Sequence, residues 1–360
     1  MATHRIAVIP GDGIGKEVIA EGVKVLRALE RLEPGLRLHL TRFGWSCDWY
    51  RKHGEVMPAD CLTVLAPFDA IYLGAIGDPA NVPDVIAQHA LLSLRKGLDQ
   101  YACVRPALLL PGVRSPLAGK APGTIDFIVV RENTEGEYAG TGGRLYRGTP
   151  KEVAVQTSIF TRLGIERIIR YAFALARRRK RRRLTSVTKS NVQQYSMVFW
   201  DEVFWAVARK FSDVEAESML VDAACMNFVR APERFDVVVA SNQFGDILTD
   251  ISAAIVGSMG LAPSANINPS RALPSMFEPV HGSAPDIAGK GIANPLAAIL
   301  AAEMMLDFLG ERRAARRLRR AAVAVLVEGK ALPADLGGRA STAEVGGAVV
   351  RHLRRAARGR

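Results

Sequence analysis

The chain has 360 residues, of which 49% are hydrophobic and 23% charged, and its formal net charge is +12 at neutral pH. This composition is typical of a soluble globular protein, and the length favours two domains over a single hydrophobic core. No apolar run reaches the roughly 18 residues of a membrane-spanning helix, so we expect no membrane partner. The start, MATHRIAVIPGDG, does not predict a signal peptide, and the four cysteines lack metal-site spacing. We therefore expect a cytoplasmic protein with reduced thiols.

The positive charge is concentrated in arginine-rich runs, the longest of which is Arg177 to Arg183. Such runs occur in nucleic-acid surfaces. This run also follows a helix predicted from about Thr161, where cations favour the negative end of the helix dipole. We therefore interpret it as a solvated helix end and predict no nucleic-acid partner.

Short apolar runs separated by helical patterns predict an α/β protein with largely parallel sheets. The runs are Arg5 to Pro10, Leu36 to Phe43, Ala70 to Gly74, Phe127 to Arg131, Leu184 to Thr188 and Val237 to Ala240. Gly136 to Thr149 and the following Val153 to Phe160 predict a projecting hairpin arm. From Ile287 onward the pattern is helical.

A glycine turn, GDGIG at Gly11 to Gly15, follows the first predicted strand and opens a helix. The dinucleotide pattern G-x-G-x-x-G would need glycine where Lys16 stands, so we predict that the fold is not a Rossmann fold. The turn still places backbone N–H groups of a helix N-terminus where an anionic or cofactor group could bind.

Asp246 and Asp250 in SNQFGDILTD lie four residues apart at the start of a predicted helix, which puts both carboxylates on one face. Two hard oxygen ligands suit Mg²⁺ or Mn²⁺. Acids in a first helical turn also simply favour the positive end of the dipole, so the spacing alone leaves both interpretations open.

Three arginines, Arg95, Arg105 and Arg131, stand in or beside predicted strands, where burial is costly without a planar anion. Each alone is explained by a structural ion pair. Together with the acid pair they indicate a site for a small dicarboxylate. Lys189 and Asp222 at strand ends, and Tyr138 in RENTEGEY, are candidate acid–base groups whose alternative is ordinary solvation or packing.

The stretch FEPVHGSAPDIAGKGIANP combines small residues with His281, Asp286 and Asn294 in a loop before a helix. Small residues allow a dinucleotide to approach the backbone, and an acid at the ribose accepts from its hydroxyls and repels a 2′-phosphate. The alternative is an ordinary glycine-rich loop.

These motifs together resemble the β-decarboxylating dehydrogenases, the metal-dependent family of isopropylmalate, isocitrate, tartrate and D-malate dehydrogenases. The similarity extends from about Arg5 to Gly310. It is carried, in the family's order, by PGDGIG, LLSLRK with VRP, RENTEGEY, TKSN, VDA, SNQFGDILTD and EPVHGSAPDIAGKGIANP.

The resemblance implies a two-domain isopropylmalate-dehydrogenase-like α/β fold of mixed, mostly parallel sheets with flanking helices. Residues 1–99 and 254–360 would form a large domain with the NAD-binding loop. Residues 100–253 would form a small domain, whose arm near 137–160 clasps a second copy in a homodimer with shared active sites. The choice between dimer and tetramer stays open.

The resemblance also implies oxidation of a 2-hydroxy acid by NAD⁺, followed by loss of a β-carboxylate, with Mg²⁺ or Mn²⁺ as the metal and a role for K⁺ left open. The arginines would hold the substrate carboxylates, and Asp246 and Asp250 would bind the metal with the partner subunit's Asp222. The partner subunit's Lys189 would be the base and Tyr138 the acid. The implied cofactor residues are Ile14, His281, Gly282, Ser283, Ala284, Asp286, Ile287 and Asn294.

The substrate is the least determined point. His89 and Leu91 stand where the isocitrate branch has Ser-x-Asn, so a third carboxylate would lack partners. Leu91 and Leu92 could form an apolar wall for 3-isopropylmalate, whereas RENTEGEY and WSCDWY look more like D-malate and tartrate dehydrogenases. We favour D-malate, with tartrate as an additional substrate and 3-isopropylmalate as the alternative.

Overall fold

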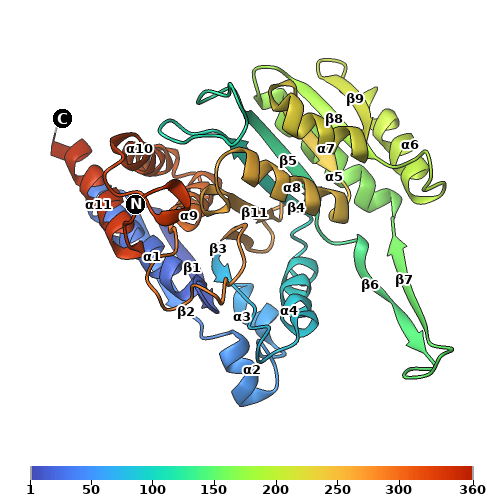
Figure 1. Ribbon diagram of the computed structural model, residues 1–360, viewed down its shortest axis with the longest axis horizontal. Helices are drawn as coiled ribbons and strands as arrows, with labels where there is room; N and C mark the ends of the chain where they lie inside the picture. Colours follow the sequence, from blue (N-terminus) through green and yellow to red (C-terminus); the bar gives the residue numbers. More distant parts are fainter. Residues whose placement is uncertain (1, 359–360) are drawn as a thin grey trace. The chain divides into compact units, whose positions relative to one another are not determined.

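The computed structural model describes residues 2–358, which fall into two compact α/β units (Figure 1). The first unit contains the described chain up to Gln100 and from Ala253 onward, together with Pro106–Ile125. The second unit contains the remaining residues, most of them in Asp126–Ser252. In each unit most of the assigned strand pairs are parallel, which confirms the predicted fold class.

The first unit is built on strands from both ends of the chain. These are β1 (Ala2–Gly11), β2 (Leu36–Arg42), β3 (Ala70–Ala75), β11 (Pro263–Ile267) and β12 (Ser275–Pro279). Their order is β2-β1-β3-β12-β11. β1 is parallel to β2 and β3, and β12 is parallel to β3 but antiparallel to β11.

The helices of the first unit cover this sheet. They are α1 (Gly15–Leu32), α2 (Cys47–His53), α3 (Cys61–Leu65), α4 (Asp84–Gly97), α9 (Leu296–Phe308), α10 (Arg312–Glu328) and α11 (Thr342–Arg358), with the 3₁₀ turns η2 (Met259–Leu261) and η3 (Ala334–Leu336). α1 buries Val18, Ile19, Val25 and Leu26 at amphipathic spacing and packs against α9 and α11. α9 is apolar nearly all round and lies in the interior.

The second unit has the strand order β4-β5-β10-β8-β9. These strands are β4 (Ala102–Leu108), β5 (Asp126–Glu132), β8 (Arg183–Thr188), β9 (Glu215–Leu220) and β10 (Val237–Ala240). The helices are α5 (Arg162–Arg178), α6 (Ser196–Ala208), α7 (Val221–Arg230) and α8 (Asn242–Ile255), with the 3₁₀ turn η1 (Pro232–Arg234). β10 is parallel to β5 and β8, and Phe127, Phe228 and Phe235 pack edge to face beneath them.

The predicted hairpin arm is present as β6 (Gly136–Leu145) and β7 (Val153–Ile159), an antiparallel pair that extends away from the rest of its unit (Figure 1). All seven residues of β7 are exposed, among them Val153 and Val155, and so are Leu145 at the end of β6 and Tyr146 in the turn. An apolar arm of this kind is typical of an interface.

The arginine run at 177–183 has a structural use within the second unit, because every second residue binds an acid or a carbonyl group. The partners are Asp213 for Arg177, Asp126 and Asp236 for Arg179, the carbonyl of Asp126 for Arg181, and Glu215 for Arg183. These contacts hold the connection between α5 and β8.

The strands β11 and β12 differ from the prediction, which recognised no strand in this part of the chain. Their sequences, PSANI and SMFEP, are short and contain proline, yet both strands are fully buried. None of the helices in the described part of the chain combines the length and the apolar character that crossing a bilayer requires.

Candidate active site

The helix α8 carries the predicted acid pair and two further polar residues on one face. Asn242, Asp246 and Thr249 are four and three residues apart, and Asp250 lies one turn beyond Asp246. The preceding strand β10 (VVVA) is completely buried, so the start of α8 is anchored to the end of a central strand. The helix therefore holds these side chains in a fixed place.

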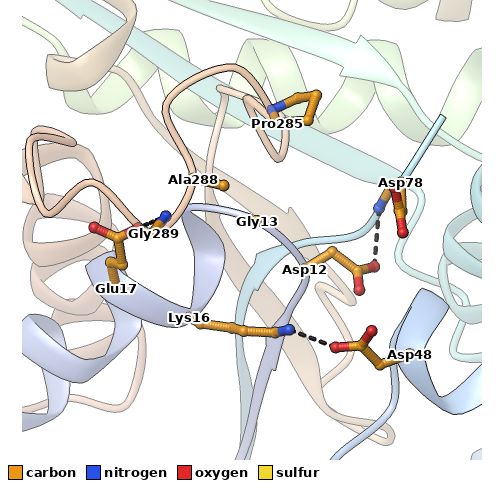
Figure 2. Close-up of a pocket in the computed structure, with 10 residues that line it drawn as sticks. Asp12, Gly13, Lys16, Glu17, Asp48, Asp78, Pro285, Ala288 and Gly289 are labelled. Atoms are coloured by element: carbon orange, nitrogen blue, oxygen red, sulfur yellow. Dashed lines mark hydrogen bonds and ion pairs between the residues drawn. The ribbon is translucent and has the colours of Figure 1, made fainter. Parts of the chain in front are cut away.

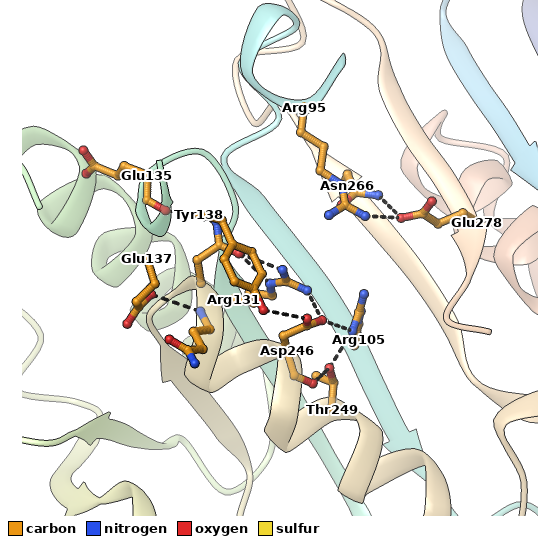
Figure 3. Close-up of polar contacts among 12 residues, drawn as sticks. Arg95, Arg105, Arg131, Glu135, Glu137, Tyr138, Asp246, Thr249, Asn266 and Glu278 are labelled. Carbon is orange, nitrogen blue, oxygen red and sulfur yellow. Dashed lines mark hydrogen bonds and ion pairs between the residues drawn. The ribbon is translucent and has the colours of Figure 1, made fainter. Parts of the chain in front are cut away.

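Arg131 at the end of β5 lies against α8 (Figure 3). Its side chain is buried, and its Nε and Nη2 atoms donate to Oδ1 of Asn242 at 2.9 and 2.7 Å. Its Nη1 atom donates to the carboxylate of Asp246. A buried guanidinium needs such partners because its charge is otherwise costly to remove from water.

Arg105 of β4 approaches the same carboxylate from a second direction (Figure 3). Its Nη1 atom lies 2.6 Å from Oγ1 of Thr249 and 3.4 Å from Oδ1 of Asp246. Two nearly buried guanidinium groups thus converge on Asp246, as the interpretation of Arg105 and Arg131 as one site requires.

Tyr138 of β6 completes this group. Its hydroxyl donates to Oδ2 of Asp246 at 3.3 Å, and the guanidinium of Arg131 lies 5.5 Å from the centre of its ring. Partial burial and the negative charge of Asp246 raise the pKa of Tyr138, so the phenol stays protonated at neutral pH. A protonated phenol beside an arginine is a competent proton donor.

Asp250 faces the same side of α8 as Asp246. Desolvation and the charge of Asp246 raise its pKa, and its carboxylate forms no hydrogen bond with the described residues. Two neighbouring carboxylates supply the hard oxygen donors that a divalent cation prefers. In residues 2–358 no group of three His, Cys, Asp or Glu side chains comes together that could hold a metal ion.

Lys189 and Asp222, the other predicted acid–base residues, form a separate pair. Lys189 follows β8 and Asp222 lies in the first turn of α7, where the ammonium group donates to Oδ2 of Asp222. This partner holds the pKa of Asp222 below its usual range. Within one chain the structure therefore does not bring Asp222 together with Asp246 and Asp250.

Arg95 and the two leucines lie on the helix α4 in the first unit, so the prediction that Arg95 stands in or beside a strand is wrong. Arg95 is buried, and its Nη2 atom donates to Oε1 of Glu278 at 2.9 Å, while Asn266 Nδ2 donates to the same oxygen at 2.7 Å (Figure 3). Leu91 is buried and Leu92 partly buried. In this structure Arg95 therefore forms a structural ion pair with Glu278, which is the alternative to a role in substrate binding.

The glycine turn after β1 contacts the predicted cofactor loop. The backbone N–H of Ile14 donates to the carbonyl of Ser283 at 2.8 Å, and a Cβ atom on Gly13 would lie 2.0 Å from that oxygen. Ala284 adopts a left-handed conformation (φ 42°), which a residue with a side chain rarely adopts and which is often found at binding sites. The loop is therefore held in a specific shape.

A cavity of about 440 Å³ opens beside this contact (Figure 2). Its walls come from the glycine turn and α1, from the start of α2, from the segment after β3 and from the cofactor loop. The lining residues are Asp12, Gly13, Lys16, Glu17, Asp48, Gly77, Asp78, Pro285, Ala288 and Gly289. Asp12 accepts from the N–H groups of Cys47 and Gly77, and Glu17 accepts from that of Gly289 at 2.6 Å.

The remaining cofactor candidates differ in their surroundings. Gly282 and Asp286 are exposed, and the N–H of Ile287 closes a turn onto the carbonyl of Ala284. Burial lowers the pKa of His281, whose Nε2 atom is buried and forms no hydrogen bond with the described residues. Asn294 donates to Asp335 and accepts from the N–H of Leu296, the first residue of α9, which indicates a structural role for this side chain.

Sequence reasoning missed the residues that hold the candidate groups in place. Asn242, Thr249 and Glu278 contact the three arginines, and Lys16 and Asp48 form a 2.5 Å ion pair at the cavity. The signal available for Asn242 and Thr249 was their helical spacing from Asp246. No local pattern pointed to Glu278, because its partner lies 183 residues away.

Comparisons with known proteins show which family the chain resembles. The family model described as isocitrate/isopropylmalate dehydrogenase matches residues 5–349. The chain is 52% identical to D-malate dehydrogenase [decarboxylating] of Escherichia coli (strain K12), covering 99% of this chain and all of that protein. It is 50% identical to tartrate dehydrogenase/decarboxylase of Pseudomonas putida, covering 96% of this chain and 97% of that protein.

The fold is also found among solved structures. The crystal structure of isocitrate dehydrogenase from Methylococcus capsulatus superimposes with a TM-score of 0.87 at 37% identity, covering 98% of this chain and 99% of that one. A family match over nearly the whole chain and relatives near 50% identity lead to one conclusion. The chain belongs to the isocitrate/isopropylmalate dehydrogenase family.

Proposed function

We propose that the protein oxidatively decarboxylates D-malate to pyruvate and CO₂, that tartrate is a second substrate, and that the reaction needs NAD⁺ and Mg²⁺ or Mn²⁺. The observation that carries this proposal is the convergence of Arg105, Arg131 and Tyr138 on Asp246, next to Asp250. The relatives named for D-malate and for tartrate support the same substrate class.

Charge balance favours a dicarboxylate that binds together with a divalent cation. Arg105 and Arg131 offset the two carboxylates of Asp246 and Asp250 in the free chain. A cation with two positive charges and a substrate with two negative charges can therefore enter together without leaving an uncompensated charge in the site. The guanidinium groups would then exchange Asp246 for a substrate carboxylate, which they bind in a planar, forked geometry.

The donor set fits a divalent metal ion. Asp246 and Asp250 would hold Mg²⁺ or Mn²⁺ through hard carboxylate oxygens, together with the partner subunit's Asp222. The cofactor loop fits a dinucleotide, because it presents a buried His281 nitrogen without a partner and the exposed acid Asp286 beside a cavity. The metal ion would supply a Lewis acid for the C2 oxygen of the substrate, and NAD⁺ would supply the hydride acceptor.

The protein's own groups would move the protons. Lys189 of one subunit, once it has left its ion pair with Asp222 and lost its own proton, would accept the proton of the C2 hydroxyl in the site of its partner. After the carboxylate leaves as CO₂, the hydroxyl of Tyr138 would donate its proton to C3 of the enol. The raised pKa of Tyr138 supports a donor that is protonated before this step.

Purified protein tests the proposal through NAD⁺ reduction with Mn²⁺ and K⁺ present. We expect kcat/KM for D-malate or tartrate to exceed that for 3-isopropylmalate and isocitrate by about tenfold or more, which is ~1.4 kcal/mol of transition-state preference. If kcat/KM were instead highest for 3-isopropylmalate, Leu91 and Leu92 would form an apolar wall that binds its isopropyl group. Activity with none of these acids would overturn the substrate class.

Two controls separate chemistry from contamination. Chelation of divalent ions should abolish turnover, and added Mn²⁺ should restore it. Asp246→Asn should abolish turnover even with added Mn²⁺, since it removes a metal ligand and a counterion together. Lys189→Ala should lower kcat much more than it changes KM, because the lysine would act on the reacting hydroxyl.

A further inference from the structure

The two arginines in the second unit are held by side chains of α8 that have no assigned role. Arg131, Asn242 and Thr249 are each at most 2% exposed and Arg105 is 6% exposed, so each polar contact among them is shielded from water. A hydrogen bond to a buried charge is stronger than one at the surface, and its loss leaves the charge poorly compensated. The contacts of α8 therefore constrain where both guanidinium groups point.

Asn242 fixes the orientation of Arg131. Its Oδ1 atom accepts from both Nε and Nη2, and its Nδ2 atom donates to the carbonyl of Glu135 at 3.0 Å. Because each end of the amide has a partner of the correct type, the amide cannot rotate without losing bonds. With Nε and Nη2 held in this way, the Nη1 atom of Arg131 is directed at Asp246.

Thr249 fixes the orientation of Arg105. Its hydroxyl donates to the backbone carbonyl of Asp246 at 2.8 Å and accepts from Nη1 of Arg105 at 2.6 Å. The bond to the backbone sets the direction of the hydroxyl, and therefore of the lone pair that receives the arginine.

Gly245, between these two residues on α8, provides the space for Arg131. A Cβ atom at this position would lie 2.6 Å from Cβ and 2.7 Å from Cγ of Arg131. These atoms belong to the base of the side chain and cannot move without moving the guanidinium. Glycine inside a helix costs stability relative to alanine, so its presence here has a packing reason.

We propose that Asn242 and Thr249 are positioning residues that aim Arg131 and Arg105 at a substrate carboxylate, and that Gly245 is required for the same alignment. The identity of that carboxylate rests on the proposed function, but the alignment itself concerns binding of any small dicarboxylate. These residues act through the arginines and do not touch the reacting atoms.

The test compares Thr249→Val, Thr249→Ser and Asn242→Ala with the wild type and with Gln243→Ala, an exposed neighbour on the same helix. Three quantities are measured with Mn²⁺ present: the dissociation constant of malonate by calorimetry, kcat and KM for D-malate, and the dissociation constant of NAD⁺. Melting temperatures are recorded for every variant.

We expect Thr249→Val and Asn242→Ala to weaken malonate and to raise KM for D-malate by about tenfold or more, since each removes hydrogen bonds to a buried charge. Thr249→Ser retains the hydroxyl and should remain within about threefold of the wild type, as should Gln243→Ala. The affinity for NAD⁺ should not change, which distinguishes misaligned arginines from general unfolding. Should Asn242→Ala fail to fold, the Thr249 pair alone decides the outcome.

The outcomes separate this inference from the proposed function. If the wild type binds malonate but oxidises no 2-hydroxy acid, while Thr249→Val binds malonate more weakly, the alignment holds and the proposed function fails. If the wild type oxidises D-malate and Thr249→Val behaves like Thr249→Ser, the function holds and the alignment is wrong. A wild type that neither binds malonate nor oxidises D-malate overturns both.

Discussion

The side chain of Tyr138 offers a test of the site's electrostatics that does not depend on turnover. Burial and the charge of Asp246 raise its pKa, so its phenolate forms at higher pH than that of a free tyrosine. In Asp246→Asn the negative charge is gone and Arg131 loses its counterion. Both changes favour the phenolate, and we expect its formation at lower pH than in the wild type.

The measurement is a spectrophotometric titration of tyrosinate absorbance. The chain has seven tyrosines, so subtracting the curve of Tyr138→Phe isolates the contribution of this one. A Tyr138 titration that stays unchanged in Asp246→Asn would show that burial alone sets its pKa, and one that moves to higher pH would contradict the role given to the charge of Asp246.

The connection between α5 and β8 depends on an ion pair that is absent from any local pattern. Arg179 donates to Asp236, whose side chain is 1% exposed, and without it this carboxylate loses its main cationic partner. We expect Arg179→Ala to lower the free energy of unfolding by about 2 kcal/mol. Lys180→Ala, next in the chain and exposed, should change it by less than about 0.5 kcal/mol.

Urea denaturation measures both variants, with the midpoint compared at constant slope. Equal stability of Arg179→Ala and Lys180→Ala would mean that the run is a solvated helix end throughout, as the sequence alone suggested.

The whole molecule is proposed to be a homodimer whose sites are shared, because Lys189 and Asp222 pair with each other apart from Asp246 and Asp250. The apolar, exposed arm of β6 and β7 suits a contact with a second copy. We expect a particle of twice 39.0 kDa by light scattering, and Val155→Asp should shift it toward the monomer.

Mixing two inactive variants tests the sharing directly. Lys189→Ala and Asp246→Asn should each be inactive alone, whereas subunit exchange restores one intact site per mixed dimer. Random mixing then yields about a quarter of wild-type activity. If each chain built its own complete site, the mixture would stay inactive.

The sequence by itself determined the α/β class, the hairpin arm and the one-turn spacing of Asp246 and Asp250, because these follow from local periodicity and glycine content. The ordered motifs sufficed to recognise the family. The strands β11 and β12 were not predictable in this way, since their burial comes from neighbours in the sheet.

Only the tertiary structure decided which charges meet. Arg131 reaches Asn242 across 111 residues of sequence, and Arg105 reaches Thr249 across 144, because β4 and β5 lie beside α8. Strand order sets such contacts, and a pattern of neighbouring residues does not encode strand order. Strand order also separates Asp222 from Asp246 and Asp250 within one chain. A helical turn sets the contacts of residues three or four apart, whereas the assembled sheet sets the contacts of residues far apart in the sequence.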